Sequence, residues 1–267
     1  MSIELFVVGK CPFGIVTESN LILALEKLGD YVDFRLDFID DREKKYREEG
    51  KKGAIIQLCA RKYSFDKYLK FILCMNKDYK NFPYNWEDCA SEFGLDIAEI
   101  RTCYEGSEGE KFYLDSLARS EKRDVKHSPT LFVNGQKDAE TGLQTDEFLK
   151  RLCHKFKEKP EGCKNIPELQ EVRLIVINDK RCKDCFPQRI IDKFKKAFPK
   201  LIVREFDYNS EEGRRFYQLL GIKLLPAYIF GRNITEEPGY NNYQRFFRDV
   251  DGYKLLTIGG KFDPTMQ

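Results

Sequence analysis

At 267 residues, the chain is long enough for one large domain or two small ones, each able to bury a core without support from metals or disulfides. Lysine plus arginine (46) nearly balances aspartate plus glutamate (44), and no basic stripe marks a nucleic-acid or anionic membrane partner. Charged residues make up 34% of the chain, a bias that proteins of hyperthermophiles share.

The cellular compartment stays open at this stage. No apolar run approaches the roughly 20 residues that a membrane-spanning helix needs, so no span is expected in this chain. Met1–Val8 lacks the basic and apolar regions of a signal peptide. The nine cysteines suit an oxidising space, although intracellular hyperthermophile proteins also carry disulfides. The protein is expected to be periplasmic or extracytoplasmic if a signal was removed, and cytoplasmic otherwise.

The chain opens with a pattern of strand, helix and strand. Ile3–Val8 is a short β-branched and apolar run, apolar residues recur at helical spacing in Ile15–Leu28, and Val32–Ile39 alternates as a strand. Cys11 stands between the first strand and the helix. This order predicts a βαβ unit whose first cysteine lies where a strand ends and a helix begins.

A long helical stretch follows the second strand. Residues from about Glu43 to Ser120 have a helical pattern with a polar surface, which predicts a helical insertion. Ser128–Val133 then predicts a strand that runs into the turn pair Asn134-Gly135. We expect Thr145 to N-cap a helix that reaches about Phe156.

The order of elements repeats in the second half. Lys157–Pro167 is rich in Lys, Glu, Gly and Pro without an apolar period, which predicts a boundary between two domains, residues 1–160 and 168–267. The two halves share little direct identity, so the repeat is architectural. The elements predicted after the boundary are strand Val172–Ile177, helix Pro187–Phe198, strand Leu201–Phe206, a Ser210-capped helix to Leu220 and strand Leu224–Phe230.

The second half carries a pair of cysteines, Cys182 and Cys185, after its first strand. A thiol at a helix N-terminus sees unpaired N–H groups, which lower its pKa from about 8.5. A second sulfur one helical turn away can attack a mixed disulfide on the first and release the reduced substrate. We therefore predict a redox-active dithiol in which Cys182 attacks. Arg181 and Lys183 add positive charge near Cys182, whereas Asp184 opposes it.

Two structural roles compete with this interpretation of the cysteine pair. A zinc site would need a second CxxC pair or two histidines at ligand spacing, but His127 and His154 both lie in the first half. The pair can also be a purely structural disulfide. We expect no metal and no cofactor.

Each half resembles a thioredoxin-fold domain, because a cysteine stands at the first strand-to-helix turn and a proline opens a later strand, at Pro129 and Pro226. The first half is similar to the DsbA and lysosomal thiol reductase group, whose helical insertion the run Trp86–Cys103 resembles. The second half is similar to a small thioredoxin or glutaredoxin unit. The resemblance implies an α/β fold of two thioredoxin-like domains in tandem, the first with a helical insertion.

The resemblance also implies where a substrate binds. In this family the proline is cis and faces the active cysteines, where an edge of backbone can pair with a substrate strand. By position, this role falls to Ser128 and Pro129 in the first half and to Leu225 and Pro226 in the second. The implied activity is thiol-disulfide exchange on protein disulfides. The implied partners are protein thiols or disulfides and a reductase or oxidase, and the direction of electron flow stays open.

The first half departs from the dithiol pattern, because Cys11-Pro12-Phe13-Gly14 has glycine where the resolving cysteine would be. Either Cys11 reacts as a monothiol, which needs an outside thiol, a glutathione-like molecule or the other domain to complete a cycle, or the site only binds clients. A non-catalytic client-binding or chaperone module is the alternative for the whole chain.

Six further cysteines are candidates for structural disulfides. Cys153 and Cys163 flank a short segment that a disulfide can close, and we predict that pair. The other four lie in the insertion and suggest two disulfides or buried thiols, with three connectivities possible. They are Cys59, Cys74, Cys89 and Cys103.

Overall fold

The structure is a computed structural model, and it describes residues 1–41, 45–138 and 140–266. The chain divides into two compact units, one of Met1–Leu149 with Phe156–Asn165 and one of Lys150–Lys155 with Ile166–Gln267. Residues 43 and 44 of the predicted insertion, and the last residue of the predicted second domain, lie outside the described residues. Within the described ranges, no helix combines the length and apolar content needed to cross a membrane.

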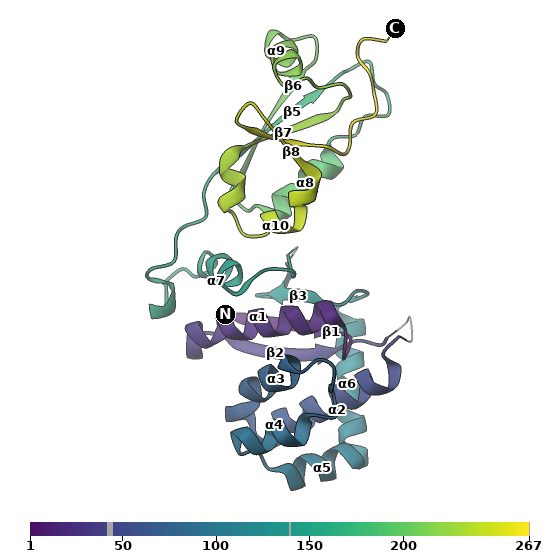
Figure 1. The fold of residues 1–267 in the computed structure, drawn as a ribbon, viewed down its shortest axis with the longest axis vertical. Helices are drawn as coiled ribbons and strands as arrows, with labels where there is room; N and C mark the ends of the chain where they lie inside the picture. Colours follow the sequence, from purple (N-terminus) through teal and green to yellow (C-terminus); the bar gives the residue numbers. More distant parts are fainter. Residues whose placement is uncertain (42–44, 139, 267) are drawn as a thin grey trace. The chain divides into compact units, whose positions relative to one another are not determined.

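A four-stranded sheet of order β2-β1-β3-β4 forms the centre of the first unit (Figure 1). β1 (Ser2–Val7) runs parallel to β2 (Asp33–Phe38) and antiparallel to β3 (Thr130–Val133), and β4 (Gln136–Lys137) pairs with β3. α1 (Pro12–Leu28) connects the two parallel strands. The predicted βαβ opening and the later strand are therefore confirmed.

The turn between β3 and β4 has the predicted residues. Asn134 and Gly135 both have positive φ, 50° and 76°. This left-handed pair is what a tight two-residue hairpin requires, and Asn-Gly tolerates it best. The turn follows directly from local sequence chemistry.

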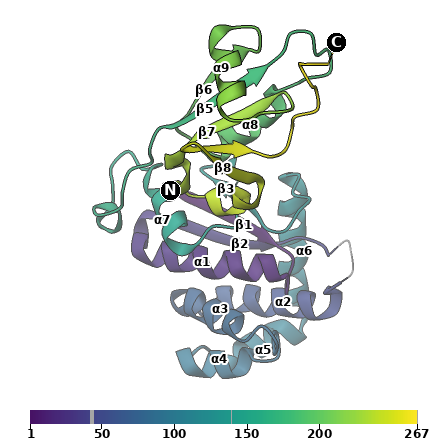
Figure 2. The same ribbon diagram turned by 45° about the horizontal axis from the view of Figure 1, so that its top comes forward.

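Helices fill the stretch between β2 and β3, so the predicted helical insertion is confirmed. In both views they gather as a group on the α1 and β2 side of the sheet (Figure 2). Disulfides join Cys59 to Cys103 and Cys74 to Cys89, which selects one of the three possible connectivities. The helices are α2 (Arg47–Tyr63), α3 (Tyr68–Lys77), α4 (Trp86–Phe93), α5 (Ile97–Glu105) and α6 (Ser107–Lys122).

α7 (Thr145–Cys153) begins and ends differently from the prediction. Thr145 is the first residue of the helix rather than its N-cap. The backbone N–H of Gln144 donates to the Glu147 carboxylate at 2.8 Å, which is one arm of a capping box and places the cap one residue earlier. The helix ends three residues before the predicted end at Phe156.

The remaining cysteines differ in redox state. Cys153 and Cys163 are both disulfide-bonded, as the predicted pair requires. Cys182 and Cys185 are joined to each other. Cys11 is a free thiol, half-exposed to solvent.

The second unit is built on a five-stranded sheet of order β6-β5-β7-β9-β8. The first two strands along the chain are parallel, and the others join antiparallel. The second βαβ unit and the strand after Pro226 are confirmed. The strands are β5 (Val172–Asn178), β6 (Leu201–Asp207), β7 (Ala227–Gly231), β8 (Phe247–Val250) and β9 (Tyr253–Leu256).

Helices connect these strands largely where the apolar periodicity places them. They are α8 (Gln188–Ala197), α9 (Glu211–Leu219) and the short α10 (Tyr240–Tyr243). The Ser210 side chain accepts a hydrogen bond from the Gly213 N–H at 3.0 Å, so the predicted cap of α9 is confirmed.

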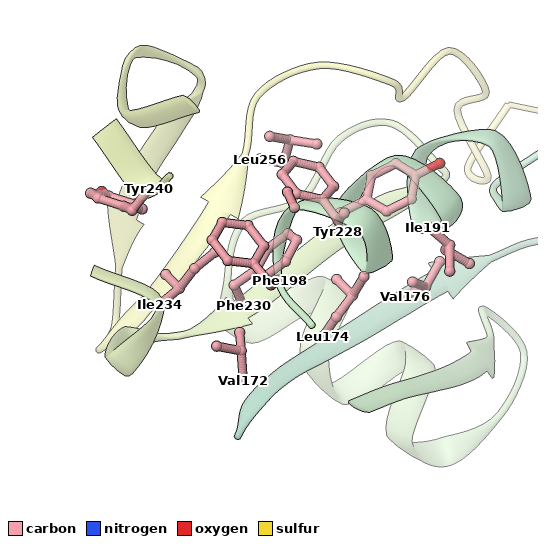
Figure 3. Packing of buried hydrophobic residues seen from close by; sticks show 12 residues of the cluster. Val172, Leu174, Val176, Ile191, Phe198, Tyr228, Phe230, Ile234, Tyr240 and Leu256 are labelled. Atoms are coloured by element: carbon pink, nitrogen blue, oxygen red, sulfur yellow. The ribbon is translucent and has the colours of Figure 1, made fainter. Parts of the chain in front are cut away.

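The core of the second unit follows from the period of two along β5. Val172, Leu174 and Val176 face one side of the sheet and pack in a cluster that includes Ile191 of α8 (Figure 3). Ile177 faces the other side and belongs to a second cluster, against which α9 packs. A sheet covered on both faces in this way holds the ends of β5 and β7 firmly, and these ends carry the site residues.

Candidate redox-active sites

Cys11 stands at the N-cap of α1, as the sequence predicts. Its backbone is extended (φ −70°, ψ 122°), its carbonyl accepts the first helical bond from Ile15 N–H at 2.9 Å, and Pro12 occupies the first helical position. Its own N–H donates to the Val8 carbonyl at 3.0 Å. The thiol makes no capping hydrogen bond. Cys11 therefore directly precedes the first turn of α1, whose N–H groups have no partner within the helix.

The Ser128–Pro129 peptide lies beside this cysteine and is cis, as the resemblance implies. Ser128 Oγ, in the proline loop, accepts a hydrogen bond from Val8 N–H, in the cysteine loop, at 2.9 Å. This bond joins the two loops. A cavity of about 580 Å³ opens between them. Its lining includes Cys11, Phe13, Lys45, Tyr46, Lys126, His127 and Ser128.

Gly14 occupies the position where a second cysteine would stand. A Cβ placed there would lie 3.4 Å from Cys11 Cβ and 3.2 Å from Val7 Cβ. Disulfide-bonded cysteines have Cβ atoms about 3.5–4.5 Å apart. The backbone of the first site is therefore close to that of a dithiol site, and only the second sulfur is missing.

The Cys182–Cys185 disulfide lies in a turn rather than at the start of a helix. Cys185 N–H donates to the Cys182 carbonyl over 3.5 Å, and α8 begins only at Gln188. The predicted location of Cys182 at a helix N-terminus is therefore wrong. The physical reason is Pro187, which disfavours helical backbone at the residue before it and itself takes the cap position of α8.

Charge near Cys182 is arranged differently from the sequence expectation. The Arg181 guanidinium lies 2.7 Å from the carboxylate of Asp179, whose side chain is 0% exposed. Hydrogen bonding to Arg181 lowers the pKa of Asp179 below its usual range. Because a buried carboxylate neutralises the guanidinium, Arg181 is not a free positive charge beside the thiol.

The Leu225–Pro226 peptide is cis, as predicted, and lies against the dithiol. Cys185 Sγ is 3.7 Å from the Leu225 carbonyl oxygen. In the disulfide this sulfur has no proton to donate, whereas after reduction the thiol can donate to that oxygen. Cys185 is buried (8% exposed), and Cys182 is half-buried and the more accessible of the two.

One buried carboxylate was not singled out from the sequence. Glu18 lies on α1, seven residues after Cys11, and is fully buried. Burial raises its pKa to about 7, against the effect of a 2.8 Å hydrogen bond from Asn76 Nδ2. The sequence carries a signal for this burial, because the spacing of Glu18 places it on the same helix face as the apolar residues Leu21 and Leu25.

Metal-ligating side chains do not gather at either site. Within the described ranges, no group of three or more His, Cys, Asp or Glu could hold a metal ion. The two sulfurs that a zinc site would use are joined in a disulfide, whereas zinc binds thiolates.

The chain matches no protein-family model and no curated protein. Among solved structures it is similar to MdbA, a thiol-disulfide oxidoreductase from Corynebacterium diphtheriae (22% identity, TM-score 0.39, 51% of this chain and 76% of the other). It is also similar to the reduced disulfide bond oxidoreductase DsbG from Mycobacterium tuberculosis (17% identity, TM-score 0.48, 60% of this chain and 80% of the other). A third similar structure is the cytosolic disulfide reductase DsbM from Pseudomonas aeruginosa with GSH (12% identity, TM-score 0.45, 57% of this chain and 97% of the other).

The topology of the chain itself defines its fold. In each unit a parallel βαβ start is joined antiparallel by a strand that follows a cis-proline, Pro129 or Pro226. In each unit the loop after the first strand carries a cysteine near that proline loop, Cys11 in the first unit and Cys185, the disulfide partner of Cys182, in the second. The chain therefore contains two α/β units, each with the strand arrangement of a thioredoxin-like domain, and the first carries a helical insertion between its strands.

Proposed function

We propose that this protein is a thiol-disulfide oxidoreductase acting on protein disulfides, with turnover carried by Cys182 and Cys185. The observation that carries the proposal is the closed Cys182–Cys185 disulfide beside the Leu225–Pro226 cis peptide, with Cys185 Sγ 3.7 Å from the Leu225 carbonyl. A disulfide that spans only three residues in an accessible loop does little to restrain the fold, which favours a redox role over a structural one.

The reduced dithiol would act in two balanced steps. The Cys182 thiolate attacks one sulfur of a client disulfide, so that a mixed disulfide forms and one client thiolate leaves. The Cys185 thiolate then attacks the Cys182 sulfur, which closes the disulfide seen here and releases the second client thiol. Two electrons pass to the client, and a partner dithiol reduces the enzyme again. With an oxidase as partner, the same steps run in reverse.

Exposed aromatic side chains favour a protein client over a small disulfide. Phe186 directly follows Cys185 and is 72% exposed, and Phe13 lies two residues after Cys11 and is 76% exposed. An exposed phenylalanine beside each reactive sulfur offers apolar contact area to an extended peptide.

The first unit is proposed to bind clients or to perform a slower monothiol step. Cys11 is a free N-cap thiol beside a cavity of about 580 Å³, but Gly14 carries no sulfur that could expel a client from it. A client attached to Cys11 would need an external thiol for release.

The assignment is tested by comparing the Cys182→Ser and Cys11→Ser proteins with the parent in an insulin-reduction assay at saturating dithiothreitol. We expect Cys182→Ser to lower the protein-dependent rate at least about 100-fold, because the remaining thiol, Cys185, is buried and has no partner sulfur with which to complete the cycle. The Cys11→Ser rate should stay within about twofold of the parent, since the dithiol cycle is intact. Loss of turnover in Cys11→Ser, with an active Cys182→Ser protein, would instead assign the enzyme to the first unit.

A further inference from the structure

The backbone edge beside Cys185 is already occupied in the second unit. Leu225 N–H donates to the Phe262 carbonyl at 2.8 Å, and Phe262 N–H donates back to the Leu225 carbonyl at 3.0 Å. Lys261 N–H donates to the same Leu225 carbonyl at 2.9 Å. These bonds form an isolated antiparallel bridge outside the main sheet.

The segment that makes this bridge is also anchored beside Cys182. Arg181 Nη2 donates to the Pro264 carbonyl at 2.9 Å, and the guanidinium lies 5.9 Å from the centre of the Phe262 ring. Arg181 is itself held by the buried Asp179. One end of segment Lys261–Pro264 thus contacts the residue before the cis-proline, and the other contacts the residue before the reactive cysteine.

The first unit lacks such an occupant. In the described part of that unit, no segment forms a backbone bridge with Ser128, the residue that precedes its cis-proline. A cavity with Ser128 and Cys11 in its lining lies there instead. The contrast indicates that a filled edge is not a general requirement of this fold.

We propose that Lys261–Pro264 acts as an intramolecular pseudo-client: it occupies the strand-pairing site at Leu225, and an extended peptide of a disulfide-bearing client must displace it to reach Cys182. This inference rests on the function proposed above. The pairing is antiparallel and uses both polar groups of Leu225, which is how an added peptide strand binds a free edge.

The segment is suited to reversible displacement. It forms neither helix nor regular strand, and its backbone bonds to the site converge on the single residue Leu225. A tethered competitor acts at an effective concentration on the order of millimolar, so it suppresses weak clients even with few contacts. A small disulfide reagent does not need the edge, because Cys182 is half-exposed while the segment is bound.

The test compares Phe262→Pro, which has no N–H to donate to Leu225, with Phe262→Leu, which keeps it. Insulin is reduced with dithiothreitol as the recycling reductant, whereas the small aromatic disulfide DTNB, which dithiothreitol reduces directly, is reacted in a single turnover with pre-reduced protein freed of dithiothreitol. We expect Phe262→Pro to raise kcat/KM for insulin about tenfold and to change the DTNB rate less than about twofold. Phe262→Leu should stay closer to the parent with both. An unchanged or lower insulin rate in a folded Phe262→Pro protein would overturn the proposal.

Hydrogen exchange provides a second test that does not depend on the proline variant. A Cys185→Ser protein is loaded with a cysteine peptide on Cys182 by chemical disulfide exchange, and deuterium uptake at the Lys261 and Phe262 amides is compared with that of the unloaded protein. We expect faster uptake in the loaded protein, and unchanged protection there would overturn the proposal. A parent protein that reduces neither insulin nor DTNB would contradict the proposed function, whereas this exchange comparison would still decide the role of the segment.

Discussion

The two cysteine sites of this chain differ in what surrounds the sulfur. Cys11 caps a 17-residue helix and faces a cavity of about 580 Å³, but has no second sulfur. Cys182 lies in a turn ahead of α8, has Cys185 as its partner, and its neighbouring edge at Leu225 is occupied by the chain itself. The first site therefore offers a single thiol at a helix terminus, whereas the second offers a pair of sulfurs, as a dithiol cycle requires.

The comparison teaches that a cysteine at a helix N-terminus and a cysteine pair can occur separately within one fold. Cys11 stands at a helix N-terminus although no second sulfur follows it in the loop. Completion of a catalytic cycle depends on a second sulfur within reach, which only the Cys182 site has.

The largest effect on activity is expected from giving the first site the second cysteine that it lacks. Gly14→Cys, made in a chain that carries Cys182→Ser and Cys185→Ser, should raise insulin-reductase activity about 100-fold over that inactive background. The reason is that a Cβ at position 14 lies 3.4 Å from Cys11 Cβ, close to disulfide spacing, with Val7 needing to move by only a few tenths of an ångström.

Gly14→Ser in the same background is the matched control, since it adds a side chain of similar size without a thiol. Intact mass measured before and after reduction reports whether the new disulfide forms. A disulfide that forms without any gain in turnover would contradict the view that the first site lacks only its second sulfur.

A buried carboxylate in each unit makes the free energy of unfolding depend on pH, with opposite signs in the two units. Glu18 in the first unit has its pKa raised from 4.5 to about 7 by burial. The unfolded chain then loses this proton near pH 4.5 and the folded chain near 7, so the free energy of unfolding falls as pH rises across that range. Glu18→Gln should increase the free energy of unfolding by on the order of 2 kcal/mol at pH 8 and change it little at pH 4.

Urea unfolding at the two pH values measures this effect, with Glu26→Gln, an exposed position on the same helix, as the control. An equal change at both pH values would show that burial does not raise the pKa of Glu18 above its value in the unfolded chain. Asp179 in the second unit has the opposite sign. Because Arg181 lowers its pKa, its contribution to stability is present above pH 3.8 and is lost as pH falls through the folded pKa.

Alkylation should separate the two sulfurs of the second site. In the reduced protein at neutral pH, iodoacetamide should label Cys182 about tenfold faster than Cys185, because Cys185 is 8% exposed and Cys182 is half-buried. Peptide mapping after brief labelling gives the two rates. Preferential labelling of Cys185 would reverse the proposed roles.

The smallest effect concerns the N-cap of α1. Cys11 makes no capping hydrogen bond there, whereas the Ser210 hydroxyl accepts one from Gly213 N–H at the start of α9. Cys11→Ser should therefore increase the free energy of unfolding by about 0.5–1 kcal/mol. Cys11→Ala is the control, because it removes the thiol without supplying an acceptor. A serine variant no more stable than the alanine variant would contradict the capping argument.

Much of the fold could be predicted because it depends on interactions that are close in sequence. Alternation along β5, helical spacing along α1, the Asn134-Gly135 turn and the Ser210 cap are each decided by residues within a few positions of one another. The error at Cys182 also has a local cause. Pro187 stops the helix from extending back to the cysteine pair, so a helix that begins there cannot place Cys182 at its N-terminus.

The sequence by itself determined the two βαβ starts, the helical insertion and the loops that carry Cys11 and Cys182, because strand and helix periods and residue identity are local properties. Tertiary structure alone decided two further features. These are the pairing of the insertion cysteines and the bridge between Phe262 and Leu225. Each joins or surrounds groups from distant parts of the chain, and no local pattern specifies which distant backbone will fill an open edge.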